Sequence, residues 1–174
     1  MTSAIDVLRD GFGRTQESLP DIVAGLSVEE LLWRPDASAN SIAWLVWHLS
    51  RVQDDHVAGV AGLEQVWTAA GWVERFALPY AAGDTGWSQS SDQVGAFSLD
   101  DPGLLTGYQA AVHELTMLAL DREDEQTLDR VVDHHWDPPV TAAVRLVSVI
   151  DDLAQHAGQA AYVRGLVERR RGSG

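Results

Sequence analysis

Apolar residues recur at helical spacing through four long segments, and this pattern most strongly constrains what the chain can fold into. In the first segment the residues that fall near helical spacing are Ile5, Leu8, Phe12, Leu19, Ile22 and Val23. Alternating apolar runs beside hairpin turns, which are the signal for strands, are scarce. We therefore predict four helices, over residues 3–25, 41–62, 102–122 and 140–168.

The four segments are expected to form one four-helix bundle with a long crossover between the second and third helices. A chain of 174 residues favours one domain with one core. We place this domain at residues 1–168 and expect a disordered tail at 169–174. Residues 63–100 are too many for a bare loop, so short helices and loops are expected there. Pro138 and Pro139 are expected to open the fourth helix. The predicted fold class is all-α.

Net charge and hydropathy exclude several classes of partner. The formal charge is −14, with 26 acidic residues against 12 basic ones, and every basic residue is arginine. Such a surface repels phosphate backbones and anionic lipid, so we expect no nucleic acid and no membrane as a partner, only a small-molecule substrate. No apolar run approaches the roughly 20 residues of a membrane span. The N-terminal stretch has no secretory signal pattern, and the protein is expected to be cytoplasmic.

The chain contains no cysteine, which limits its chemistry. Disulfides, thiolate zinc sites and a cysteine nucleophile are excluded. Any metal must be bound by His, Asp or Glu. Any thiol chemistry must take its thiol from a small molecule.

A metal site can be proposed in the fourth segment, where Asp152 and His156 are four residues apart. Residues at this spacing lie one above the other on a helix, so both side chains could reach one ion, with His48 of a facing helix as a third ligand. Three nitrogen or oxygen donors with an open position suit catalytic zinc, and also iron, nickel or manganese. By spacing alone, the solvated face of an amphipathic helix explains Asp152 and His156 better than a metal site, and a histidine at the edge of the core explains His48 better than a ligand.

Two stretches carry a resemblance to a known family. "NSIAWLVWHLSRVQDDHVA" (40–58) and "VRLVSVIDDLAQHAGQAAYVRG" (144–165) are similar to the second and fourth helices of the DinB-like family, and "DRVVDHHWDPPVT" (129–141) falls at its third-to-fourth connection. The resemblance covers nearly the whole chain. It is closest to the branch that contains the N-terminal metal-binding domain of mycothiol-dependent maleylpyruvate isomerase. It implies a four-helix bundle with a long second-to-third crossover.

The resemblance also implies a ligand set of His48, Asp152 and His156. The middle ligand is usually His or Glu in the family, and Asp is one methylene shorter than Glu. Asp151 is a poorer substitute because its spacing to His156 is five residues. Zinc is the expected metal, with nickel, iron or manganese as alternatives.

Other polar residues are assigned to the surroundings of this site. Asp55 and His56 are the candidate catalytic residues, Asp55 as a base and His56 as a base near the metal or an extra ligand. His134 and His135 either line the mouth of the site or are solvated loop residues. His113 has no partner that the sequence identifies.

Three functions remain open. The first is a thiol-dependent S-transferase, in which the metal activates mycothiol or a similar small thiol. The second is a hydrolase, in which the metal activates water and Asp55 takes the proton. The third is a non-catalytic bundle that uses its apolar surface to dimerise, and family members of this size often form homodimers. Isomerase activity is not expected, because the isomerase carries a further C-terminal domain.

Seven tryptophans are many for this length. Trp44 and Trp47 flank His48, whereas Trp67, Trp72 and Trp87 lie in the crossover. They are expected either to be large core residues or to form an aromatic wall over the metal pocket.

Overall fold

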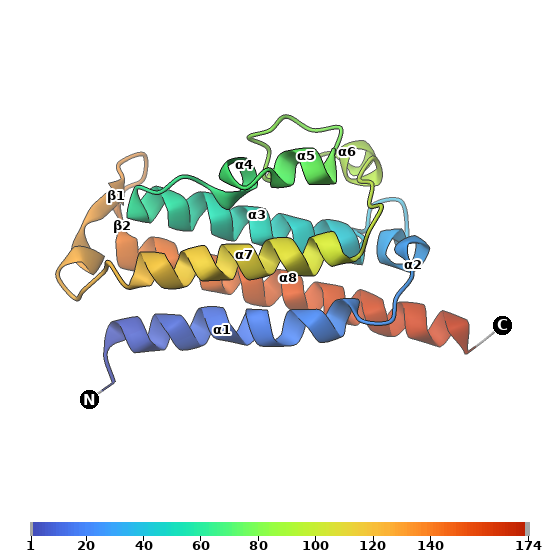
Figure 1. Cartoon of the computed structure of the whole chain (residues 1–174), viewed down its shortest axis with the longest axis horizontal. Helices are drawn as coiled ribbons and strands as arrows, with labels where there is room; N and C mark the ends of the chain where they lie inside the picture. The colour runs from blue at the N-terminus through green and yellow to red at the C-terminus, as the bar shows by residue number, and fades with distance from the viewer. Residues whose placement is uncertain (1, 173–174) are drawn as a thin grey trace.

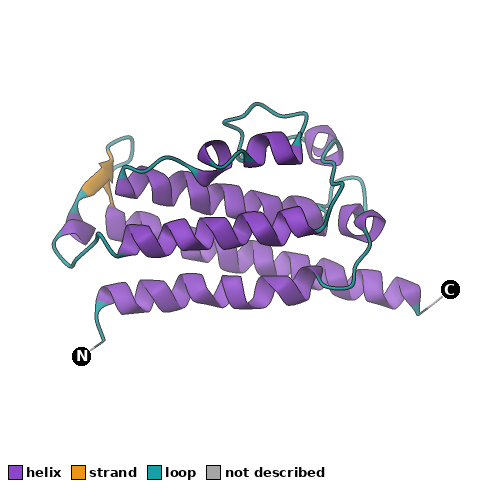
Figure 2. Ribbon diagram, viewed as in Figure 1, coloured by secondary structure: helices purple, strands orange, loops and turns teal. Residues whose placement is uncertain are grey.

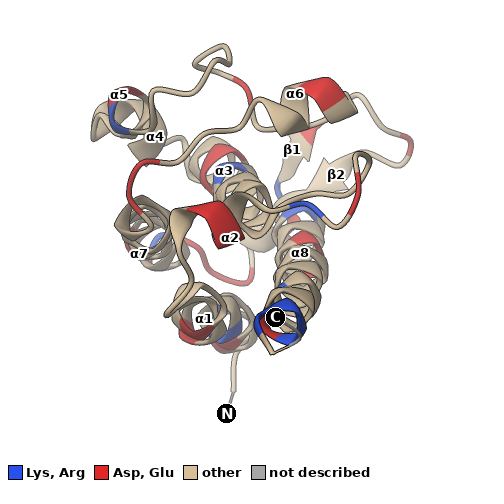
Figure 3. Ribbon diagram, turned by 90° about the vertical axis from the view of Figure 1, so that its right-hand side faces the viewer, with Lys and Arg blue, Asp and Glu red and all other residues tan. Residues whose placement is uncertain are grey.

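Four long helices form the body of the protein in a computed structural model that describes residues 2–172 (Figure 1). They are α1 (Ala4–Val23), α3 (Ile42–Ala61), α7 (Gly103–Leu120) and α8 (Ala142–Arg171). Each contacts two neighbours: α3 packs on α7 and α8, and α1 packs on the same two helices. The end-on view shows this four-cornered arrangement (Figure 3). The predicted all-α bundle is confirmed.

The helices begin where the sequence supplies caps. The hydroxyl of Ser3 accepts from the backbone N–H of Asp6, whose carboxylate accepts from the Ser3 N–H in return. The hydroxyls of Ser41 and Thr141 cap α3 and α8 by accepting from the backbone N–H groups of Trp44 and Val144, without the reciprocal bond. The last turn of α3 closes on Gly62, whose φ of 64° is left-handed.

The crossover explains how α3 and α7 come to run in the same direction. Between them the chain returns along the outside of the bundle through α4 (Val66–Ala69), α5 (Trp72–Phe76) and α6 (Ser91–Gly95) (Figures 1 and 2). The short helices and loops expected over residues 63–100 are therefore confirmed. A further short helix, α2 (Val28–Leu32), links α1 to α3 and carries the capping box of Ser27 and Glu30.

A buried polar cluster ties the crossover to the bundle. Arg51 and Asp54 of α3 are both fully buried. The Asp54 carboxylate accepts from the backbone N–H groups of Val66 and Trp67 and from the Tyr108 hydroxyl, at 2.8–3.0 Å. The Arg51 guanidinium lies 3.6 Å from Asp54. It donates to the Gln65 side chain, to the Tyr108 hydroxyl and to the Asp84 carbonyl. Burial of paired charges is tolerated only when hydrogen bonds surround them, so this cluster fixes where the crossover starts and where it passes over α3.

The start of the fourth helix differs from the prediction. Pro138 and Pro139 precede α8 but do not open it, and the Asp137–Pro138 peptide is cis. The η1 turn (Thr127–Asp129) leads into a two-stranded antiparallel sheet of β1 (Val131–Asp133) and β2 (Val140–Thr141). Strands of three and two residues are too short to produce the alternation on which strand prediction depends.

The predicted tail at 169–174 is also different in the structure. Helix α8 continues to Arg171, which forms an ion pair with Glu30 and donates to the Gly25 carbonyl. Arg170 lies over the Trp33 ring, 4.4 Å from its centroid. The basic end of α8 therefore packs on the α2 region (Figure 3). Residues 173 and 174 lie outside the described part of the chain.

Large apolar side chains from all four helices fill the centre of the bundle. Those that are almost completely buried include Phe12, Leu19, Leu45, Leu49, Leu105, Leu120 and Leu146. Within residues 2–172, no helix combines the length and the apolar character needed to cross a membrane.

Candidate metal centre

His48 is placed by the buried middle of α3 and is only 5% exposed. The Trp44 ring stacks on its imidazole, with 4.7 Å between centroids and 14° between planes. Trp44 is held in turn by a hydrogen bond from its Nε1 to the Gln89 side chain. Burial lowers the pKa of His48 and so favours the neutral imidazole, which is the form that binds a metal.

The crossover fixes which nitrogen of His48 is free. Nδ1 lies 2.6 Å from the carbonyl oxygen of Thr85. A carbonyl only accepts, so Nδ1 carries the proton and Nε2 keeps its lone pair. This is the arrangement that supports metal-binding histidines, in which the second ring nitrogen donates to the protein.

Gly86 allows this close approach. Its φ is 91°. A Cβ atom at this position would lie 2.7 Å from Nδ1 of His48 and 2.9 Å from the Trp44 ring. Asp84 shapes the same turn by accepting from the Gly86 N–H and from the Gln89 side chain. Since Arg51 donates to the Asp84 carbonyl, the buried cluster of α3 is connected to the turn that holds His48.

Helix α8 supplies the other two residues. The Nε2 atom of His156 lies 3.4 Å from Oδ1 of Asp152, one turn earlier. Its Nδ1 atom lies 3.0 Å from Oε1 of Gln159. The Asp152 carboxylate is the main cause of the raised pKa of His156. As in His48, an acceptor on the protein occupies Nδ1, and in His156 the Nε2 atom lies toward Asp152.

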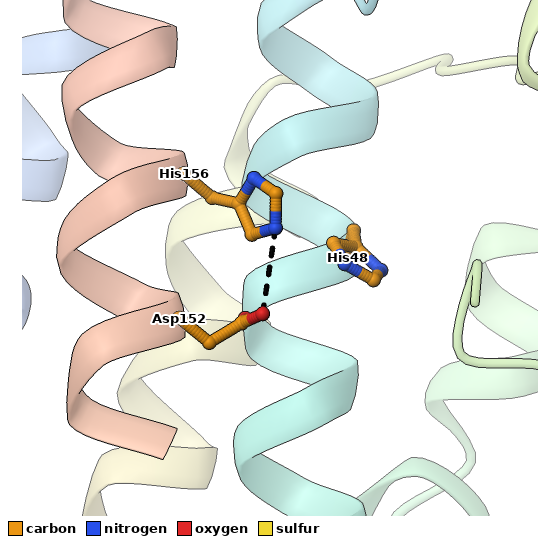
Figure 4. A group of neighbouring side chains, drawn as sticks. All are labelled: His48, Asp152 and His156. Atoms are coloured by element: carbon orange, nitrogen blue, oxygen red, sulfur yellow. Dashed lines mark ion pairs between the residues drawn. The ribbon is translucent and has the colours of Figure 1, made fainter. Parts of the chain in front are cut away.

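The three side chains meet between α3 and α8 (Figure 4). One donor atom from each of His48, Asp152 and His156 lies within 4.8 Å of the others. Bonds of zinc to nitrogen and oxygen are about 2.0–2.2 Å, so small side-chain rotations would bring three such donors onto one ion. Oδ2 of Asp152 is buried and has no hydrogen-bond partner among the described residues. A buried acceptor without a donor is uncommon in proteins, and a cation would satisfy it. The donor set therefore fits a divalent metal.

Asp55 and His56 lie beside this cluster rather than in it. Oδ2 of Asp55 is 3.5 Å from Nδ1 of His56, and Oδ1 of Asp55 accepts from the Gln65 side chain. Burial, and then the charge of Arg145, lower the pKa of His56. Both residues line two adjoining cavities.

The remaining sequence candidates have different positions. Asp151 is exposed and accepts from Gln155, so the structure brings Asp152 rather than Asp151 to the histidines. His134 and His135 lie in the β1–β2 connection and line a cavity of about 600 Å³ that His56 also lines. His113 of α7 is not among the three residues grouped at the site.

A second cavity, of about 540 Å³, reaches the candidate ligands. Its ten lining residues are Val52, Asp55, His56, Thr85, Trp87, Trp136, Arg145, Ser148, Val149 and Asp152. We call it the tryptophan cavity, because Trp87 and Trp136 are its largest side chains. Trp44, Trp47, Trp67 and Trp72 are buried in the core. The core interpretation therefore holds for these four tryptophans, whereas Trp87 lines the pocket together with Trp136.

Sequence reasoning missed several residues around the site. Thr85, Gly86 and Trp136 were not singled out, because they lie in connections that helical periodicity does not describe. The one available signal was the position of Trp136, directly after two histidines in a polar connection.

Comparisons with known proteins agree with this architecture. A family model described as mycothiol-S-transferase matches residues 7–169. A crystal structure titled as a conserved protein from Enterococcus faecalis superposes with a TM-score of 0.89 at 32% sequence identity, over 96% of this chain and 98% of that one. No curated protein matches the chain. With 163 of its residues inside the family match, from 7 to 169 inclusive, the chain belongs to the mycothiol-S-transferase family of DinB-like proteins.

Proposed function

We propose that this protein is a metal-dependent S-transferase that joins the sulfur of mycothiol, or a closely similar small thiol, to an electrophilic substrate. The observation that carries the proposal is the convergence of His48, Asp152 and His156 beside an open cavity. Membership of the mycothiol-S-transferase family supports the choice of thiol. The absence of cysteine requires that the nucleophilic sulfur come from a second substrate.

His48, Asp152 and His156 would hold the metal, and zinc suits two imidazoles and one carboxylate with an open position. A bound divalent cation would lower the pKa of a thiol that reaches it and stabilise the thiolate. The protein sets the orientation of the two imidazoles through Thr85 and Gln159. These supports reduce the rearrangement needed when the metal binds.

We assign to His56 the role of accepting the thiol proton. It lines the tryptophan cavity together with Asp152, and its lowered pKa keeps it neutral near pH 7. Asp55, 3.5 Å from Nδ1 of His56, would stabilise the imidazolium that forms. As the S–H proton passes to His56, the sulfur electron pair forms a bond to the electrophilic carbon. The leaving group then departs with the electrons of the bond that breaks.

Two measurements test the proposal. The first is metal content per chain by elemental analysis, on protein purified without chelator or affinity nickel. About one divalent ion per chain is expected in the wild type and in His113→Ala, and none in His48→Ala or His156→Ala. His113→Ala is the matched control, because it removes a histidine that lies outside the cluster.

The second measurement is conjugation of mycothiol to 1-chloro-2,4-dinitrobenzene, followed by the absorbance of the thioether product. Metal-dependent conjugation is expected, with loss in both ligand variants. A wild type that binds no added zinc or nickel would refute the metal site. A metal-loaded protein that forms no conjugate would refute the transferase and favour a hydrolase at the same site.

A further inference from the structure

Two large aromatic side chains stand exposed at the tryptophan cavity. Trp87 of the crossover is 82% exposed, and Trp136 of the β1–β2 connection is 65% exposed. Both line the cavity that Asp152 also lines. An indole ring carries a large apolar area, so two exposed rings at one pocket indicate a ligand that covers them.

The rest of the cavity is polar. Apart from the two tryptophans, only Val52 and Val149 among its lining residues are apolar. The polar side chains are the carboxylates of Asp55 and Asp152, the imidazole of His56, the guanidinium of Arg145 and the hydroxyls of Thr85 and Ser148. Flat aromatic rings bordered by carboxylates, guanidinium groups and hydroxyls are the chemistry of carbohydrate binding: the rings stack on C–H faces and the polar groups pair with hydroxyls.

Charge pairing favours a neutral polyhydroxyl ligand over an anionic one. The Arg145 guanidinium lies 2.6 Å from a carboxylate oxygen of Asp133, so its charge is already balanced. Asp55 and Asp152 add negative charge to the same wall, and the whole protein carries −14. A phosphate or carboxylate ligand would be repelled here, whereas a sugar hydroxyl can bond to either member of such a pair.

Two cavities border the candidate metal centre, and the one lined by Asp152 suits a ligand attached to the metal better. A cavity of about 730 Å³ touches Gln159, but Gln159 binds Nδ1 of His156, on the ring edge opposite Nε2. The tryptophan cavity instead includes Asp152 itself, one of the three candidate ligands. It adjoins the cavity of about 600 Å³, because both are lined by Asp55, His56 and Arg145. The two cavities therefore adjoin beside the candidate metal centre.

We propose that Trp87 and Trp136 form the binding subsite for the sugar portion of the thiol substrate. Mycothiol carries its cysteine on an uncharged glucosamine-linked inositol unit, a polyhydroxyl group attached to a thiol. With the sulfur at the metal centre, the sugar stacks on the two indoles and its hydroxyls pair with Arg145 and Ser148. The volume of about 540 Å³ is in the range of small-molecule sites. This inference rests on the proposed function for its choice of thiol.

The test compares two thiols on the metal-loaded protein. Mycothiol carries the sugar, and N-acetylcysteine carries the same sulfur without it. Loss of a stacked aromatic contact is expected to raise the KM for mycothiol about tenfold in Trp87→Ala and in Trp136→Ala. The KM for N-acetylcysteine should stay unchanged. Trp33→Ala is the matched control, because Trp33 packs under Arg170 at the far end of α8, and it should change neither value.

A sulfur-free probe separates this inference from the proposed function. N-Acetylglucosaminyl-inositol keeps the amine acylated and uncharged as in mycothiol but lacks the thiol, so its binding, measured by titration calorimetry, does not depend on catalysis. Binding by the wild type that is lost in Trp87→Ala would support the subsite even if no thiol were transferred. No binding by the wild type, or equal KM increases for both thiols in the tryptophan variants, would overturn the inference while leaving the transferase intact.

Discussion

A single added methyl group at Gly86 should weaken metal binding without removing any ligand. The new Cβ atom would lie 2.7 Å from Nδ1 of His48, 2.9 Å from the Trp44 ring and 3.1 Å from the Trp47 ring. None of these neighbours is the free end of a flexible chain, since all three rings are buried in α3. The turn at 84–86 must therefore move away from His48.

The cost of Gly86→Ala has two parts that can be measured separately. An alanine held at a φ of 91° is strained by roughly 1–3 kcal/mol, which lowers the free energy of unfolding. Domains of this kind have about 5–15 kcal/mol of stability, so the variant is expected to fold. Retreat of the turn also breaks the 2.6 Å contact between Thr85 and Nδ1 of His48. Loss of such a supporting partner typically weakens metal affinity about 10–100-fold.

Competition for zinc with a chromophoric chelator measures this affinity on the folded protein, and urea unfolding of the metal-free protein measures the strain. Gly83→Ala is the matched control. Gly83 lies in the same crossover, and a Cβ atom there meets nothing within 4 Å, so this variant should bind zinc like the wild type. Equal zinc affinities in Gly86→Ala and the wild type would refute the reasoning that the crossover holds His48 in its binding orientation.

Two further predictions concern the buried charges and the end of α8. Replacing Asp54 by Asn leaves Arg51 without its buried counter-charge, and urea unfolding should show a loss of about 3–5 kcal/mol; a loss below 1 kcal/mol would contradict a structural role for the pair. The Arg171 guanidinium is the main cause that lowers the pKa of Glu30 from 4.5 to about 2. The ionised pair therefore stabilises the fold above pH 4.5, and this contribution is lost as the pH falls through about 2. The Tm difference between the wild type and Glu30→Gln should be small and should decrease with added salt. It should disappear as the pH falls from 4.5 to about 2. A Tm difference that persists at low pH would contradict the assignment.

Most of the bundle could be predicted because helix formation depends mainly on residues that are close together in the sequence. Apolar spacing located all four long helices, and cap residues such as Ser41 and Thr141 mark where α3 and α8 begin. The errors occur where the conformation depends on distant partners. Arg171 is helical in contact with Glu30, which is 141 residues away in the chain. The β1–β2 pair likewise gains its hydrogen bonds from pairing, which two such short segments do not reveal.

The grouping of the candidate ligands depended only partly on local sequence. The spacing of one helical turn between Asp152 and His156 predicts that they share a face, whereas the choice of His48 from a distant helix rested on the family resemblance. The shorter side chain of Asp152 does not keep it from the cluster, since its carboxylate lies 3.4 Å from His156. Thr85, which holds His48, could not be identified, because the contact joins residues 37 apart through an irregular loop.

This division between helices and connections has a consequence for specificity. The three candidate ligands come from α3 and α8, whose packing the whole fold maintains. The two largest side chains of the tryptophan cavity come from connections: Trp87 from the crossover and Trp136 from the β1–β2 connection. Connections tolerate sequence change far better than packed helices. Under the proposed function, changes at Trp87 and Trp136 would therefore alter which thiol and which electrophile bind, whereas the three candidate ligands would stay in place.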